Sequence, residues 1–303
     1  MLRHLFLFLS RRPRLRRWME ESPSAARLTS RFVAGRTIED ALRVTRQINQ
    51  GGSSATLDYL GESVTTGQEA SAARDVYLRL IEAIHAQNLN ANVSLKLTQL
   101  GIDISEQACR ENLAAIANRA RALENFVRVD MESSAYTERT LALATALHSS
   151  CANLGVVVQS YLHRSEKDIE ELIRCGIRIR LCKGAYAEPP EVAFPRKSQV
   201  DASFDKLGRL LLLTGNYPAL ATHDEKLLLA LVRFAGDHNI DRNAYEIQML
   251  YGIRRDLQAR FRAQGHRVRV YVPFGGAWYP YFMRRLAERP ANAYFVARHL
   301  LRR

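Results

Sequence analysis

The sequence lacks several features that define common protein classes. No run of apolar residues is long enough to cross a bilayer. Neither GxGxxG nor GxxxxGK followed by Ser or Thr occurs, so no Rossmann dinucleotide site and no P-loop is indicated. The few cysteines form no CxxC or CxxH pair, which disfavours zinc binding and a disulfide framework and makes a reducing compartment the default. They are Cys109, Cys151, Cys175 and Cys182.

Acidic residues are also scarce relative to basic ones. Asp and Glu total 31 whereas Lys and Arg total 44, which gives a formal net charge of +13. Such an excess favours an anionic partner, whether nucleic acid, anionic lipid, or an acidic substrate or cofactor. The remaining composition, 47% hydrophobic and 25% charged in 303 residues, is that of one large α/β domain or two smaller ones.

The first fifty residues differ in character from the rest. Residues 1–20 are rich in arginine around a short apolar run at 5–9, which is too short for the core of a signal peptide. Three interpretations stay open: a mitochondrial presequence, an amphipathic helix on anionic lipid, or a solvated arm packed on the domain. We assign 1–50 to a basic N-terminal helical arm. We expect a cytoplasmic, peripherally membrane-associated protein, with the matrix side of the mitochondrial inner membrane as the alternative.

From residue 51 onward, short apolar or alternating runs alternate with helical patterns. Alternation of this kind indicates βαβ units, and eight pairs in about 250 residues predict a (β/α)8 TIM-like barrel over 51–303 with an extra C-terminal helix. A doubly wound open sheet is the alternative fold. The expected strands are 56–60, 92–97, 126–131, 155–161, 177–182, 219–222, 245–249 and 267–272. The expected helices are 69–86, 106–123, 137–148, 166–175, 202–213, 225–238, 254–264 and 278–288.

The fifth expected strand is the most informative stretch. Apolar and charged residues alternate through 177–181, so Ile179 is expected under a helix and Arg178 and Arg180 toward the barrel interior. Lys183 and Gly184 then end the strand in a small turn where a ligand can approach the backbone closely. Taken alone, the stretch is more typical of an ordinary strand that ends in a loop, and it is the rest of the chain that favours a functional role.

Polar residues stand at the ends of all the expected strands. The carboxyl ends of barrel strands carry the chemistry in this fold, so we expect these side chains to surround one mouth. Some must be structural, and Asp58 or Glu246 is a candidate for neutralising a buried cation. The set is Asp58, Glu62, Lys96, Asp130, Glu132, Gln159, Tyr161, Arg180, Lys183, Tyr186, Thr222, His223, Glu246, Gln248 and Tyr271.

The last expected helix carries a second candidate feature. Tyr281 and Arg285 are four residues apart and share a face, and Arg284 lies beside them. Paired guanidiniums with a phenol suit a carboxylate clamp, because arginine binds carboxylates through two parallel hydrogen bonds. An exposed basic helix is the alternative in a chain of this charge.

In order along the chain, these motifs resemble those of proline dehydrogenase, a family of FAD-dependent barrel enzymes. The resemblance runs from about residue 32 to about residue 298, and the run at 180–197 is its most specific part. It is carried by LDYLGE at 57–62, SLKL at 94–97, VDME at 129–132, VVVQSYL at 156–162, RLCKGAYAEPPEVAFPRK at 180–197, ATHD at 221–224, YEIQMLYGIR at 245–254, YVPFG at 271–275 and YFMRR at 281–285. Cys182 departs from the family, which often has a branched apolar residue there, and we expect a buried neutral thiol.

The resemblance implies roles for particular residues. The catalytic pair is Asp130 and Arg180, with Asp130 orienting Lys96 and Arg180 lying near the flavin ring. Glu62 matches an acidic gate residue that pairs with an arginine of the last helix. No metal is implied. The substrate set is Lys96, Tyr186, Tyr271, Tyr281, Arg284 and Arg285. The FAD set is Met131, Gln159, Arg180, Lys183, Gly184, Ala185, Thr222, His223 and Gln248.

The implied reaction is the oxidation of L-proline to 1-pyrroline-5-carboxylate by hydride transfer to FAD. This is the first step of proline degradation to glutamate, with a membrane quinone as electron acceptor. The chain ends at Arg303, so we expect the monofunctional bacterial type without an aldehyde dehydrogenase domain. The alternatives are a lyase or aldolase that forms a Schiff base through Lys96 or Lys183, a folate-using flavin barrel, and a basic nucleic-acid-binding protein.

Overall fold

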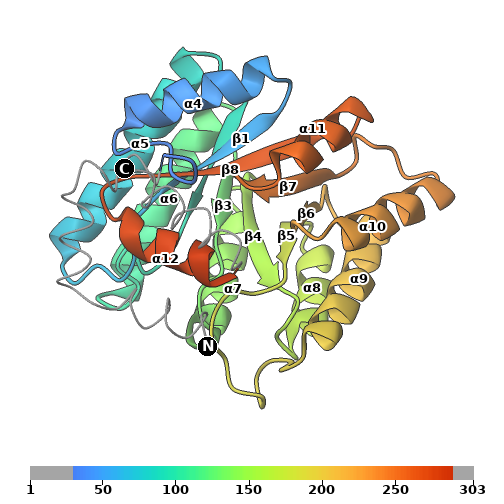
Figure 1. The fold of residues 1–303 in the computed structure, drawn as a ribbon. Helices are drawn as coiled ribbons and strands as arrows, with labels where there is room; N and C mark the ends of the chain where they lie inside the picture. The colour runs from blue at the N-terminus through green and yellow to red at the C-terminus, as the bar shows by residue number, and fades with distance from the viewer. Residues whose placement is uncertain (1–29, 289–303) are drawn as a thin grey trace, which may run out of the picture.

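The computed structural model describes residues 30–288, and the side chains of 284–288 lie outside that description (Figure 1). Within these residues, eight parallel strands close into a barrel in sequence order. The predicted (β/α)8 barrel is therefore confirmed, and the open sheet is excluded. The strands are β1 (Ser54–Tyr59), β2 (Ala91–Leu95), β3 (Val127–Val129), β4 (Leu154–Gln159), β5 (Arg178–Cys182), β6 (Ala219–Ala221), β7 (Glu246–Leu250) and β8 (Val268–Phe274).

Helices alternate with the strands, as the periodicity predicted. They are α4 (Ile38–Gln50), α5 (Gly67–Ala86), α6 (Glu106–Ala122), α7 (Ser134–His148), α8 (Ser165–Arg174), α9 (Lys197–Thr214), α10 (Glu225–Asp237), α11 (Arg255–Ala263) and α12 (Trp278–Glu288). Several begin earlier than expected: α9 starts at residue 197 rather than 202. Capping determines some starts, since Thr66 accepts a hydrogen bond from the backbone of Glu69 at the first turn of α5.

The two faces of the barrel wall differ in polarity. Leu57, Val129 and Ile179 alternate with polar neighbours, and their buried side chains belong to the apolar core shared with the surrounding helices. The intervening side chains of Asp58 and Asp130 are buried on the other face, inside the barrel. Period-2 alternation therefore places apolar groups under the helices and charged groups in the interior.

The barrel closes between its first and last strands. β1 pairs with β8 from Ser54–Arg269 to Tyr59–Phe274. The helix that packs against both strands is α4, which precedes β1, rather than α12, which follows β8. The two helices lie on different sides of β8 in Figure 1.

The C-terminal helix α12 packs near the carboxyl ends of strands. Its Trp278, Tyr281 and Phe282 form an apolar cluster with Leu60, which follows β1, and Ile253, which follows β7. It is thus an additional helix, as predicted. Residues 1–20 lie outside the described residues, and the domain boundary at residue 50 stays a prediction. Among residues 30–288, no helix is both long and apolar enough to span a membrane.

Candidate active site at the carboxyl ends of the strands

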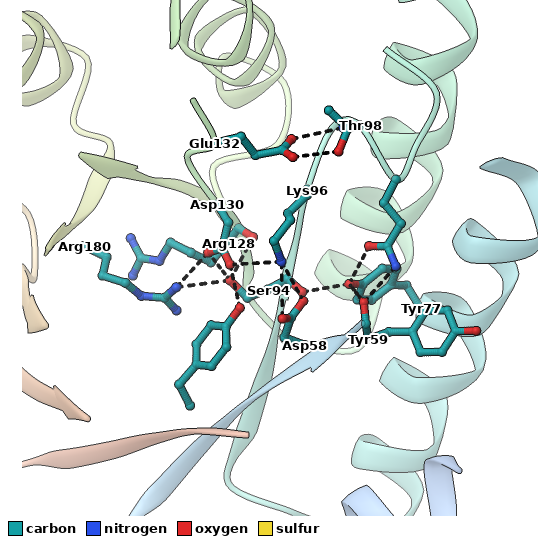
Figure 2. Close-up of polar contacts among 12 residues, drawn as sticks. Asp58, Tyr59, Tyr77, Ser94, Lys96, Thr98, Arg128, Asp130, Glu132 and Arg180 are labelled. Carbon is teal, nitrogen blue, oxygen red and sulfur yellow. Dashed lines mark hydrogen bonds and ion pairs between the residues drawn. The ribbon is translucent and has the colours of Figure 1, made fainter. Parts of the chain in front are cut away.

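Asp130 is the centre of a buried polar network inside the barrel (Figure 2). It directly follows β3, and its Oδ1 accepts hydrogen bonds from Arg180 Nη1 at 2.7 Å and from Ser94 Oγ at 2.5 Å. Its Oδ2 accepts one from Tyr271 Oη at 2.7 Å. Side chains from β2, β5 and β8 therefore donate hydrogen bonds to one carboxylate, in line with the prediction that polar residues at the strand ends gather at one mouth.

Lys96 enters the same network beside β2. Its Nζ lies 3.3 Å from both carboxylate oxygens of Asp58 and 3.9 Å from Asp130 Oδ2. Burial opposes the charge on Lys96, but Asp58 and Asp130 together raise the pKa of its ammonium above the ordinary value. The cation is thus held charged in a buried site, and Asp58 holds it more closely than Asp130 does. The expectation that Asp58 neutralises a buried cation is confirmed.

Arg180 has donors that the described residues do not use. Its side chain is buried and its Cζ lies 5.1 Å from the centroid of the Tyr271 ring. Nη1 serves Asp130 and also Ser94 Oγ at 3.2 Å, whereas Nε and Nη2 have no hydrogen-bond partner among the described residues. Because buried donors are nearly always paired, this side of the guanidinium is available to an acceptor from outside the chain.

The turn after β5 contains a glycine that packs closely against the ring of Tyr161. Gly184 has φ +115°, and a Cβ there would lie 2.3 Å from the ring of Tyr161. The protein group that requires a glycine at this position is therefore Tyr161. Cys182 is partly exposed, so the expectation of a buried thiol is wrong.

The side chain of Lys183 is held by two carboxylates. Its Nζ lies 2.6 Å from Asp201 Oδ1 and 2.8 Å from Asp224 Oδ2. Although burial opposes ionisation, hydrogen bonds from Lys183 lower the pKa of both aspartates. Any contribution of residues 183–185 to a cofactor site would therefore come mainly through the backbone.

The other residues expected near the flavin lie at or beside strand ends, and several bond to neighbouring elements. Gln159 donates to the carbonyl of Glu132 at 2.8 Å. His223 Nε2 accepts a hydrogen bond from the backbone N–H of Leu250 at 2.9 Å, which ties the end of β6 to β7. Thr222 Oγ1 accepts one from the N–H of Asp224 at 3.2 Å. Met131 and Gln248 are buried.

The loop that carries Tyr186 is fixed by a residue to which the sequence assigned no role. Glu188 accepts hydrogen bonds from the backbone N–H and the hydroxyl of Ser134, at 2.7 and 2.5 Å, at the start of α7. Ser133, the N-cap residue, makes no side-chain capping bond, so Glu188 supplies an anionic acceptor at that helix end. No spacing rule reveals such a contact, because it joins residues 54 positions apart.

Glu246 was placed at the wrong end of its strand. It is the first residue of β7 rather than the last, and its carboxylate oxygens accept hydrogen bonds from Arg269 Nε at 2.9 and 3.0 Å. Its suggested role in neutralising a buried cation is confirmed, but it lies at the amino end of the barrel. Arg178, at the start of β5, is half-buried at the same end.

The clamp and the gate stay predictions. Tyr281 is buried in the cluster of α12, whereas the side chains of Arg284 and Arg285 lie outside the described part of the chain. Glu62 is half-buried and close enough to Lys96 for its charge to raise the pKa of that lysine. Tyr186 is half-buried and acts on Lys96 in the same direction.

The model of the proline dehydrogenase family matches residues 41–298. The chain belongs to the proline dehydrogenase family. Its relatives include proline dehydrogenase 1 of Bacillus subtilis strain 168, which is 42% identical over 304 residues and 100% of both chains. Proline dehydrogenase of Deinococcus radiodurans is 40% identical, over 91% of this chain and 90% of that protein.

A solved structure places this family member on a known barrel. Proline utilization A from Bdellovibrio bacteriovorus, inactivated by N-propargylglycine, matches with a TM-score of 0.82 and 26% identity. The match covers 87% of this chain and 33% of that larger one. As a member of the proline dehydrogenase family, the protein is an oxidoreductase, and the resemblance in the strand-end motifs is confirmed.

Proposed function

We propose that the protein is an FAD-dependent proline dehydrogenase that oxidises L-proline to 1-pyrroline-5-carboxylate and passes the electrons to a quinone. This reaction would be the first step of proline degradation to glutamate. The observation that carries the proposal is the buried Arg180, which is paired with Asp130 on one side and has Nε and Nη2 unpartnered among the described residues. Family membership supports the same assignment.

The residues at the carboxyl mouth fit a flavin. A bound flavin would supply the hydride acceptor. Arg180 offers two N–H donors and a permanent positive charge, which stabilises the negative charge that an acceptor gains on reduction. The residues that would hold the cofactor are those at the ends of β4 to β7: Gln159, the backbone of 183–185, Thr222, His223 and Gln248.

The same mouth fits an amino-acid carboxylate. Lys96 supplies a buried cation beside Asp58 and Asp130, and Tyr271 offers a phenol held by Asp130. Arg284 and Arg285 would add the clamp from α12. Hydride leaves the ring carbon next to nitrogen, a proton leaves that nitrogen, and a C=N bond forms. Nearby cations disfavour an added ammonium charge and so assist the proton loss.

A redox titration tests this function. The purified protein is expected to be yellow, and anaerobic addition of L-proline is expected to bleach its flavin absorbance, whereas D-proline serves as the control. A colourless protein that acts on another substrate through a lysine Schiff base would contradict the proposal. Bleaching by a reduced folate in place of proline would also contradict it.

The quinone and membrane parts of the proposal rest on the arginine-rich residues 1–20. We propose that they dock a cytoplasmic enzyme on anionic membrane. Deleting residues 1–20 is expected to reduce binding to anionic vesicles and to leave proline oxidation with a soluble dye unchanged. Equal vesicle binding by the shortened and full chains would contradict this docking role.

A further inference from the structure

A polar cavity lies at the amino ends of the strands, at the opposite end of the barrel from the candidate active site. It has a volume of about 390 Å³. Its wall includes the starts of β5, β7 and β8 and the segments that follow α5 and α6. Three arginines line it, Arg128, Arg178 and Arg269, together with Glu246 and the exposed Asn88. We call it the amino-end cavity.

Arg128 is the deepest of these residues. Its side chain is buried inside the barrel, and its Nη1 donates to the carbonyl oxygens of Arg178 at 2.6 Å and Val156 at 3.3 Å. Its Nε has no partner, and no carboxylate lies within ion-pair distance of it among residues 30–288. A Cβ at Gly155 would lie 2.8 Å from Arg128 Nη1, so the glycine makes room for the guanidinium.

Arg178 stands nearer the opening. Its Cζ lies 5.3 Å from the ring centroid of Phe126 and 5.2 Å from that of Tyr217. Within the described residues its guanidinium makes these ring contacts but no hydrogen bond or ion pair. Stacking on aromatic rings fixes a guanidinium while its N–H edge stays available for a planar acceptor.

The charges of the cavity do not balance. Glu246 is the buried carboxylate here, and Arg269 Nε already bonds both of its oxygens. The exposed Glu124 stands at the rim, and α5 and α6 end there with partial negative charge, so some of the excess is offset. Burial is the main cause that lowers the pKa of Arg128, to about 9; the charges of Arg180 and Arg269 act in the same direction, and those of Glu246 and Asp130 oppose them in part.

We propose that the amino-end cavity binds a small oxyanion, a phosphate or a carboxylate, through the guanidiniums of Arg128 and Arg178. Guanidiniums recognise such groups through paired hydrogen bonds, and the cavity offers one buried and one partly exposed guanidinium without a carboxylate partner among the described residues. The site does not depend on the flavin or on proline, because it lies at the other end of the barrel.

Calorimetric titration with inorganic phosphate tests the site on the full-length protein as purified, at constant ionic strength against chloride. Saturable binding with one site per chain is expected. Arg178→Gln is expected to weaken it roughly tenfold to a hundredfold, the value of one charge-assisted hydrogen bond. Arg242→Gln is the matched control, since Arg242 precedes β7 at the same end but does not line the cavity. It should keep wild-type affinity.

Other results would overturn the site. These are a lack of saturable heat with both phosphate and the dicarboxylate succinate, or equal affinity of the wild type and Arg178→Gln. A second variant, Arg128→Lys, keeps the buried positive charge but loses the planar set of guanidinium N–H donors, and it is expected to weaken phosphate binding. Its melting temperature, measured without phosphate, checks that it is folded. Competition by vesicles of phosphatidic acid would assign the oxyanion to a lipid headgroup, and its absence would assign it to a free ion.

Discussion

The two ends of the barrel interior use the same residue types in different proportions. At the carboxyl end, Lys96 and Arg180 are matched by Asp58 and Asp130 within one hydrogen-bonded network. At the amino end, three arginines line a cavity whose one buried carboxylate among the described residues, Glu246, is paired with Arg269 alone among them. A cluster with equal numbers of cations and carboxylates holds its charges in fixed geometry. A cluster with an excess of arginines still attracts an anion.

The two ends also show that a charged side chain inside a barrel is not by itself a sign of an active site. Barrel interiors are commonly packed with branched apolar side chains in layers. Here both ends of the interior are charged, so a charged residue on an inward position does not by itself indicate catalysis. The pairing pattern distinguishes the ends: the carboxyl-end network gathers side chains from several strands around Asp130.

The largest effect is expected from Arg180→Met. Loss of a preorganised cation beside the acceptor is expected to lower the flavin midpoint potential and to slow reduction by proline by about 10²–10³-fold. Asp130 keeps hydrogen bonds from Ser94 and Tyr271, so the fold should survive. Arg178→Met, which removes the same charge at the other end, is the control. A folded Arg180→Met protein with wild-type potential and reduction rate would mean that Arg180 merely neutralises Asp130.

Glu246→Gln is expected to separate stability from activity. Removing this buried carboxylate leaves Arg269, whose side chain is only 13% exposed, without its charge partner, and breaking a buried ion pair costs about 3–5 kcal/mol of unfolding free energy. Denaturant unfolding measures the loss, and the Michaelis constant for proline should stay near the wild-type value in the folded fraction. The exposed Glu124→Gln should change neither quantity. A strong effect of Glu246→Gln on the Michaelis constant for proline would contradict this separation, because it would mean that Glu246 contributes to substrate binding from the amino end of the barrel.

A smaller effect is expected from Glu188→Gln. The change weakens the bonds to Ser134 that fix the loop carrying Tyr186, and one charge-assisted hydrogen bond is worth about 1.5–3 kcal/mol. The Michaelis constant for proline is expected to rise up to roughly tenfold. Glu191→Gln, an exposed change in the same loop, is the matched control. Identical kinetics in both variants would show that the hydrogen bonds between Ser134 and Glu188 do not position Tyr186.

The smallest effect is expected from Lys183→Gln and depends on pH. Lys183 lowers the pKa of Asp201 and Asp224, so its stabilisation is complete above the ordinary aspartate pKa of about 3.9 and is lost as pH falls through the lowered values. The stability difference from wild type should be about 1 kcal/mol at neutral pH and shrink in acid. A difference that grows in acid would contradict the pairing.

Much of the fold followed from the sequence because alternation is a local signal. The segments of all eight strands were predicted, and so was the gathering of Lys96, Asp130 and Arg180 at one mouth. Residue spacing does not give the end of a strand at which an inward residue lies, which is why Glu246 was misplaced. Contacts across the fold, such as Glu188 with Ser134 and Asp58 with Lys96, depend on loop paths and strand stagger that local pattern does not encode.

The pairing of β1 with β8 has a consequence for synthesis of the protein. Ser54 of β1 lies opposite Arg269 of β8, and α4 packs against both strands. Neither β1 nor α4 therefore has all of its neighbours until β8, which ends at residue 274, has been made. During translation the nascent chain therefore presents two open sheet edges and an α4 whose apolar face is only partly covered. Such edges are templates for aggregation, and chains cut short before β8 are expected to depend on chaperones or to be degraded.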